Sequence, residues 1–182
     1  MSLLRRAPTR GRFLLGLAFT VAACGGAVSQ RPADASGDWR QFEGSWNAVG
    51  TRHAISLGTN RTGAVVDLTG SMLLTGSGRP GVGFQAQVIG LVDSATGFQG
   101  RSVWTDEHGD QVFSALQGEG TAARNHIAGE ILSGTGRYAG VTGSYEFSWQ
   151  WVLEGEEAAV HGRAVDLQGR VRFDPAAGQR PQ

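Results

Sequence analysis

The chain has 182 residues, of which 29 are glycine and 5 are proline, and 40% of the residues are hydrophobic. The glycines follow no G-X-Y period and only 18% of the residues are charged, so the composition excludes a collagen and a disordered polyelectrolyte. Sixteen arginines balance sixteen acids, whereas a nucleic-acid binder usually has a basic surplus. We therefore expect a single Gly-rich, all-β domain with no nucleic-acid partner.

Residues 1–23 have the features of a lipoprotein signal peptide. A basic region precedes the apolar segment 13–23 and contains Arg5, Arg6, Arg10 and Arg12. As a helix the apolar segment would span about 16 Å, roughly half of the ~30 Å hydrocarbon core of a bilayer. The pattern therefore predicts an export signal and not a membrane span.

The end of this segment, Val21-Ala-Ala-Cys-Gly25, resembles a bacterial lipobox, in which a signal peptidase cuts before a diacylated cysteine. Cys24 is the only cysteine, so no internal disulfide can form. The alternative is ordinary cleavage nearby, which would leave Cys24 as a spectator thiol. We predict a lipid such as palmitate on Cys24, because two or three acyl chains anchor a protein stably. Gly25 is not the aspartate that favours inner-membrane retention, so the predicted location is the cell envelope, on the outer membrane facing the periplasm.

Composition divides the rest of the chain into three parts. Residues 24–41 are small, polar and non-periodic and are expected to be a flexible tether, residues 42–173 are the predicted β-barrel domain, and residues 174–182 are an expected disordered tail. Without residues 1–23 the chain carries 12 arginines against 16 acids, which disfavours electrostatic attraction to anionic lipid. The lipid on Cys24 is therefore the predicted membrane contact.

Period-two alternation of apolar and polar residues, broken by short Gly-containing turns, recurs through the domain. It predicts eight strands, at residues 45–55, 64–75, 81–92, 98–106, 111–119, 123–133, 143–154 and 158–173. The turns are short, so consecutive strands should pair antiparallel. The clearest alternation places Tyr145, Phe147, Trp149 and Trp151 on one face of a single strand.

Eight antiparallel strands with one apolar face each favour a closed up-and-down, calycin-like barrel, which leaves no sheet edge exposed. A β-sandwich is the alternative. The bends that closure requires are expected at strand glycines such as Gly70, Gly90, Gly100, Gly129 and Gly162. Such a barrel is either filled by its own side chains or holds one small ligand, and the sequence leaves both open.

The segment Gly134-Thr-Gly-Arg-Tyr-Ala-Gly-Val-Thr-Gly143 resembles the Gly-Thr-Gly-x-aromatic-x-Gly-x-x-Gly turn of allene oxide cyclase-like and dirigent-like barrels. Upstream, Thr105-Asp-Glu-His-Gly-Asp110, followed by Phe113 and Gly118, resembles a hairpin of their bacterial relatives. The chain is thus similar to a bacterial lipoprotein member of this family, over residues 42–173. The resemblance implies an eight-stranded barrel with an apolar lumen, in a family whose members often form oligomers. It implies the fold and not the activity.

Within that turn, close backbone approach and positive φ are expected at Gly134, Gly136, Gly140 and Gly143. The aromatic ring of Tyr138 is expected to plug one end of the barrel.

No residue pattern predicts a metal, a cofactor or a catalytic site. The histidines His53, His108, His126 and His161 have no ligand spacing, and the acidic segment 106–110 has the composition of a hairpin turn and lacks the spacing of a calcium loop. There is no G-x-S-x-G elbow for a nucleophile. Glu146 and Arg163 are expected to pair on the surface between the last two strands.

The aromatic stripe has two interpretations: it is barrel core, or it is a ligand wall made by Tyr145, Phe147, Trp149 and Trp151. We predict a lipid-anchored envelope barrel that binds a small apolar molecule without catalysis. One alternative is a cyclase or isomerase that folds its substrate in an apolar lumen. The other is a structural or protein-interaction module of the envelope, with an apolar outer patch.

Overall fold

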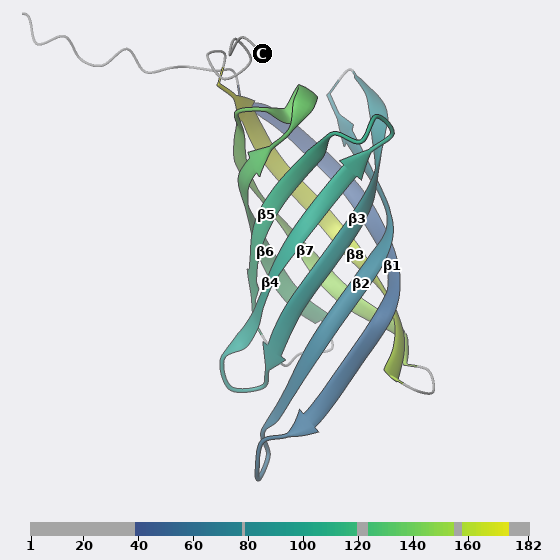
Figure 1. The fold of residues 1–182 in the computed structure, drawn as a ribbon, viewed down its shortest axis with the longest axis vertical. Helices are drawn as coiled ribbons and strands as arrows, with labels where there is room; N and C mark the ends of the chain where they lie inside the picture. The colour runs from purple at the N-terminus through teal and green to yellow at the C-terminus, as the bar shows by residue number, and fades with distance from the viewer. Residues whose placement is uncertain (1–38, 78, 120–123, 155–157, 175–182) are drawn as a thin grey trace, which may run out of the picture. The chain divides into compact units, whose positions relative to one another are not determined.

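The computed structural model describes residues 39–174, except residues 78, 120–123 and 155–157. The described residues form eight strands and one short 3₁₀ helix, with bounds β1 (Arg40–Ser56), β2 (Thr62–Gly76), β3 (Arg79–Asp93), β4 (Gly97–Asp106), β5 (Gln111–Gly118), β6 (Arg124–Gly134), η1 (Gly136–Tyr138), β7 (Val141–Glu154) and β8 (Ala159–Phe173). Each strand pairs antiparallel with its neighbours in sequence, and β8 pairs with β1, so the sheet closes into a barrel (Figure 1). The predicted eight-stranded up-and-down barrel is confirmed, and the β-sandwich alternative is wrong.

The predicted strands all occur, and the largest difference lies at the start of the domain. β1 begins at Arg40, so Arg40 and Gln41 of the expected tether belong to the barrel. They pair with Val171 and Arg170 of β8, and these long-range partners are not visible in the local sequence pattern. Cys24, the expected signal peptide, the tether up to residue 38 and the tail from residue 175 lie outside the described residues.

Alternate residues of every strand point into the lumen and form the hydrophobic core. The two runs with the clearest apolar alternation, residues 64–74 and 84–88, bury the side chains of Val66, Leu68, Met72 and Phe84, among others. The residues between them face outward; Asp67 and Gln85 are examples. The period of two thus fixes which face of each strand is buried.

Lumen-facing glycines explain much of the high glycine content. The rings of Trp149 and Tyr145 occupy the space that a Cβ atom would take on Gly162 and Gly129, and the ring of Phe98 does so over Gly90 and Gly100. An eight-stranded barrel has room for its interior side chains only when large and small residues alternate. Glycine beside these rings helps to meet this requirement.

A β-bulge in β8 affects which outward-facing side chains meet across β7 and β8. The bulge contains Asp166, whose φ is 55°, and it shifts the register of β8 against both of its neighbours. Glu146 lies opposite Gln168, whose Nε2 donates to Glu146 Oε1 over 2.8 Å. Arg163 lies opposite Gln150 and donates to its Oε1 over 3.0 Å. The expected Glu146–Arg163 pair is wrong, because the register places Arg163 five residues from the partner of Glu146, and a bulge of one residue does not account for that distance.

Candidate functional site

The lumen contains two separate apolar chambers, one at each end of the barrel. The first, which we call the Tyr138 chamber, lies at the end where β8 finishes and where the β2–β3, β4–β5 and β6–β7 connections meet. It has a volume of about 190 Å³. Its lining includes Phe42, Phe84, Trp104, Tyr138, Val141 and Val171. These residues come from six parts of the chain, and the predicted ligand wall on β7 includes none of them.

A packed layer around Tyr145 separates the two chambers. The Tyr145 ring lies 4.7 Å from the Trp104 ring and 6.3 Å from the Phe147 ring, measured between centroids. Its hydroxyl lies 3.2 Å from Ser102 Oγ, and the buried Ser114 stands directly opposite Ser102. Burial raises the pKa of Tyr145, so this phenol stays neutral. The middle of the lumen is therefore closed by side chains.

The second chamber, which we call the Trp149 chamber, lies on the other side of this layer and has a volume of about 40 Å³. Phe147, Trp149 and Trp151 of the predicted wall line it, together with Trp46 from β1. The Trp149 ring centroid lies 5.1 Å from that of Trp46 and 5.4 Å from that of Trp151. Three of the four predicted ligand residues thus share one chamber, and the fourth, Tyr145, belongs to the layer between the chambers.

The Tyr138 end of the barrel is held by Asp106, which the structure buries although its segment has the composition of an exposed turn. Asp106 Oδ1 accepts the backbone N–H groups of His108 (2.8 Å) and Asp110 (3.0 Å). Its Oδ2 accepts the Tyr138 hydroxyl over 3.1 Å and lies 3.1 Å from Arg137 Nε. The segments 105–110 and 134–143 are therefore joined through the Asp106 carboxylate, and also through Asp110, whose Oδ2 accepts the Arg137 backbone N–H over 3.1 Å.

The charge of Asp106 is maintained by its partners. Burial raises the pKa of Asp106, but the two backbone N–H groups, the Tyr138 hydroxyl and the Arg137 guanidinium together hold it below its ordinary value. Burial and the adjacent Asp106 carboxylate raise the pKa of Tyr138 to about 12. The carboxylate and the phenol thus form a stable acceptor–donor pair at neutral pH.

The glycines of the turn allow its path over the barrel end. Gly136 and Gly140 have φ values of 50° and 73°, which residues with a side chain rarely adopt. Thr135 also fixes the turn, because its N–H donates to Gln111 O and its Oγ1 accepts from Gln111 N, both over 2.8 Å. This path places the Tyr138 ring 5.6 Å from the Phe84 ring, where it covers the chamber.

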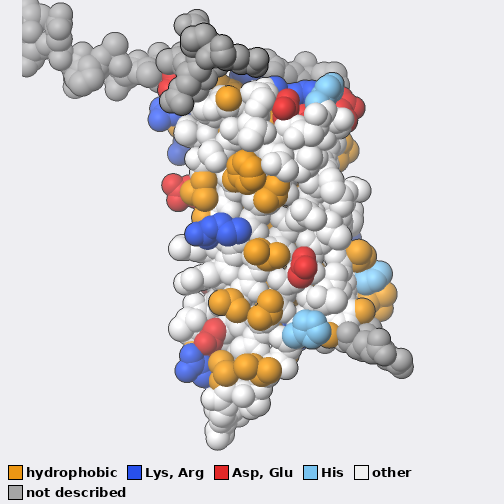
Figure 2. Space-filling view, viewed as in Figure 1, with side chains coloured by type: hydrophobic (Ala, Val, Ile, Leu, Met, Phe, Trp, Pro, Cys, Tyr) orange, Lys and Arg blue, Asp and Glu red, His pale blue; other side chains and the backbone are white. Residues whose placement is uncertain are grey.

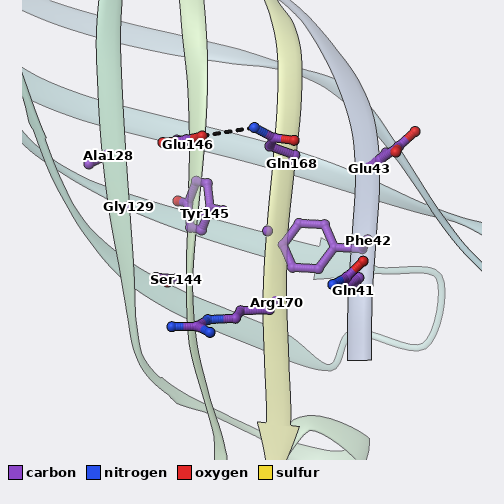
Figure 3. Close-up of a pocket in the computed structure, with 11 residues that line it drawn as sticks. Gln41, Phe42, Glu43, Ala128, Gly129, Ser144, Tyr145, Glu146, Gln168 and Arg170 are labelled. Carbon is purple, nitrogen blue, oxygen red and sulfur yellow. Dashed lines mark hydrogen bonds between the residues drawn. The ribbon is translucent and has the colours of Figure 1, made fainter. Parts of the chain in front are cut away.

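A shallow groove of about 430 Å³ crosses the outer face of β6, β7, β8 and β1. Figure 3 shows its lining, with the hydrogen bond between Glu146 and Gln168 spanning β7 and β8. Glu146 Oε2 also lies 3.5 Å from His126 Nε2. The groove contains acids from two strands and the cation of Arg170, and its lining also includes Phe42 and Tyr145, so its surface is mixed polar and apolar.

The outer face also exposes several large apolar side chains. Val65 and Leu91 stand directly opposite each other on β2 and β3 and are 51% and 62% exposed, and Ile89 nearby is 59% exposed. Figure 2 shows apolar side chains in separate clusters on the face in view, with charged side chains of both signs beside and between them.

Among the described residues, no three His, Cys, Asp or Glu side chains gather in a way that could hold a metal ion. Helices in the same part of the chain are too short or too polar to cross a membrane.

The closed sheet and its apolar interior define a small eight-stranded β-barrel of the type that packs its lumen or holds one small ligand. Comparisons with protein-family models, with curated proteins and with solved structures find no match to this chain.

Proposed function

We propose that the protein binds a small apolar molecule in the Tyr138 chamber. The observation that carries the proposal is a cavity of about 190 Å³ whose lining is mostly aromatic and aliphatic, with the exposed residues Arg40, Gln41 and Thr75 as its other polar members. Binding sites for small molecules are typically such concave apolar pockets with a few polar groups. Among the less exposed lining residues the polar group is the Tyr138 hydroxyl, which donates a hydrogen bond to Asp106.

The volume limits the size of the ligand. An engineered apolar cavity of about 150 Å³ stays dry and binds benzene. The Tyr138 chamber is slightly larger, at about 190 Å³, so it suits a molecule with one ring or a short branched chain. The ligand is held by burial of apolar surface and needs no charge.

Val171→Phe is expected to fill this chamber and to weaken binding of a one-ring apolar ligand such as toluene at least tenfold. Val171 is half-buried on β8 and lines the Tyr138 chamber, and the larger ring takes up ligand space. A tenfold change corresponds to about 1.4 kcal/mol of binding free energy. Isothermal titration calorimetry measures it.

The matched control is Val92→Phe, which makes the same change on a half-buried valine that lines the Trp149 chamber. It should leave toluene binding unchanged. Of the tryptophans that line the two chambers, only Trp104 lines the Tyr138 chamber, so the ligand-induced change in emission should disappear in Trp104→Phe. Equal weakening by both valine substitutions would contradict this placement.

We further propose that a lipid on Cys24 anchors the barrel to the cell envelope, on the outer membrane facing the periplasm. The lipobox-like sequence before Gly25 supports this, as does the position of Cys24 fifteen residues before Trp39, where the described chain begins.

Cys24→Ser is expected to release the protein from the membrane fraction into the soluble periplasmic fraction, because serine cannot take the thioether-linked lipid. Fractionation followed by immunoblotting measures the release, and Cys24→Ser should leave the thermal unfolding of the barrel unchanged. A variant that remains in the membrane fraction would show that another contact holds the protein there.

The cyclase alternative lacks support from Asp106, because this carboxylate already accepts hydrogen bonds from two backbone N–H groups and Tyr138 and lies against Arg137. The interaction alternative is favoured by one observation, the exposed apolar side chains of Val65, Ile89 and Leu91. The partner that fits the expected oligomer is a second copy of this chain. Analytical ultracentrifugation measures this association as a sedimenting mass above that of the monomer.

A further inference from the structure

The Trp149 chamber contains two buried hydrogen-bond donors that have no acceptor. Trp46 is 4% exposed and Trp149 is 5% exposed. Neither indole Nε1–H has a hydrogen-bond partner among the residues that the structure describes. The two rings come from β1 and β7 and line the same chamber, with their centroids 5.1 Å apart.

Such a pair of groups requires a physical explanation. A buried donor without an acceptor loses its hydrogen bond to water on folding and gains nothing in exchange. For this reason, the large majority of buried polar side-chain atoms in proteins have a partner. Two unpaired donors in adjacent rings are therefore more informative than one, because both rings line the same chamber and a ligand there would be near both.

The surroundings of the two donors restrict what this acceptor can be. Apolar side chains such as Val66, Leu68 and Phe147 make up most of the lining, and none of the described lining residues is charged. Asn125 of β6 also lines the chamber, but neither indole Nε1–H is hydrogen-bonded to it. A carboxylate would lose its hydration there with no cation to compensate, at a large cost in free energy. The acceptor is therefore expected to be neutral, and a carbonyl oxygen meets this requirement.

The dimensions of the chamber restrict the rest of the molecule. Its volume of about 40 Å³ admits only a few non-hydrogen atoms, since one water needs roughly 10–15 Å³ by this measure. The chamber extends from the buried Leu68 and Leu116 to the half-buried Val92 and Trp151 at the barrel end. A ligand would place its polar head between the indoles and its apolar body along this rim.

We propose that the Trp149 chamber binds the neutral carbonyl group of an apolar molecule, with the indole N–H groups of Trp46 and Trp149 donating to its oxygen. Both Nε1 atoms are buried, so the two rings would have to rotate to bring the donors onto the oxygen. This site lies on the opposite side of the Tyr145 layer from the Tyr138 chamber, so it goes beyond the function proposed above and does not depend on it. Gly162 helps to position Trp149, because the indole lies where a Cβ atom would be.

The test compares three ligands of equal chain length: a medium-chain methyl ketone, the alkene in which a methylene group replaces its oxygen, and the fatty-acid anion. Isothermal titration calorimetry on the purified protein gives the three dissociation constants. We expect Trp46→Phe and Trp149→Phe each to lower the preference for ketone over alkene, and the double variant to lower it about tenfold. The preference is the ratio of the alkene and ketone dissociation constants. Comparing this ratio between the unmodified protein and a variant cancels the difference in hydrophobicity between the two ligands.

The matched control is Trp151→Phe. This residue lines the same chamber and loses the same part of its ring, but its N–H is not among the buried groups without a partner. It should keep the preference for the ketone. If a tryptophan variant fails to fold, the infrared carbonyl stretch of the ketone bound to the unmodified protein still decides, because two hydrogen bonds shift it below its value in an alkane solvent.

Three results would overturn the proposal. Equal affinity for ketone and alkene in the unmodified protein would mean that the indole donors are not used. Stronger binding of the fatty-acid anion would exclude a neutral acceptor. Ketone binding that is absent, or that is lost in Val171→Phe and kept in Val92→Phe, would exclude this chamber. Toluene binding in the Tyr138 chamber is measured independently, so a failure of either site is recognised separately.

Discussion

Gly70→Ala is expected to destabilise the barrel by at least about 3 kcal/mol, at the upper end of what overpacking costs. A Cβ on Gly70 would overlap the backbone oxygen of Asn47 on β1 and lie 2.7 Å from Ala48 Cα. Both are backbone atoms of a paired strand and cannot rotate away, in contrast to the end of a flexible side chain. To make room, β1 and β2 would have to move apart near Gly70, in the middle of a long run of paired residues (Figure 1).

Urea unfolding followed by far-UV circular dichroism measures the loss. Gly83→Ala is the matched control, because Gly83 lies on the adjacent strand β3 and a Cβ there has no atom within 4 Å. This control should be neutral or stabilising by roughly 0.4–1 kcal/mol, since alanine restricts the unfolded chain more than glycine does. Equal stability of the two variants would mean that β1 and β2 separate at little cost.

Asp106→Ala is expected to destabilise the protein by roughly 2–4 kcal/mol, because hydrogen bonds to a charged acceptor are worth about 1.5–3 kcal/mol each and are not additive. The substitution leaves the Tyr138 hydroxyl and the backbone N–H groups of His108 and Asp110 without their acceptor. Arg137 is 43% exposed, so water replaces its contact at little cost. Asp106→Asn should lose about half as much, since its amide oxygen still accepts the backbone N–H groups. Urea unfolding measures both changes.

The same residue predicts a dependence on pH. The folded-state pKa of Asp106 lies below its ordinary value of 3.8, so its contribution to stability is complete above the unfolded-state pKa of about 3.9. That contribution is lost as the pH falls through the lower, folded-state value. The urea midpoint of the unmodified protein should therefore fall on acidification below about pH 4, and this fall should be smaller in Asp106→Asn.

Asp93 is the comparison for this titration. Its hydrogen bond and ion pair with Arg61, over 2.6 Å, help to lower the pKa of Asp93 to about 2, so it titrates in the same range. The pair is exposed and therefore screened by water, and Asp93→Asn should change the pH dependence less than Asp106→Asn does. The opposite order would mean that Asp106 is not the main acid-sensitive contact of the fold.

The local sequence pattern was sufficient to predict the eight strands and their buried faces. Alternation is a property of consecutive residues, and Tyr145, Phe147, Trp149 and Trp151 face the lumen for this reason alone. Turn chemistry was equally local, as the left-handed Gly136 and Gly140 illustrate. These features depend on the backbone geometry of a few neighbouring residues.

The sequence could not determine which side chains meet across the barrel. Trp46 and Trp149 come from strands that are not adjacent in the sheet, and Asp106 meets Arg137 and Tyr138 across about thirty residues of chain. The alternation of Trp46 and Ala48 with polar residues was a signal that Trp46 faces inward, but it did not indicate which ring it would contact.

What the sequence alone determined is therefore the architecture: strand number, antiparallel order and the apolar lumen. The tertiary structure alone decided that the lumen is divided into two chambers and that two indole donors share the smaller one. The physical reason is that closure fixes the tilt and register of all eight strands together, with the bulge at Asp166 as one of its adjustments. The alternation of apolar and polar residues shows which side chains face the lumen. It does not show how far along the barrel axis each of them lies, because that depends on how the strands are aligned with one another.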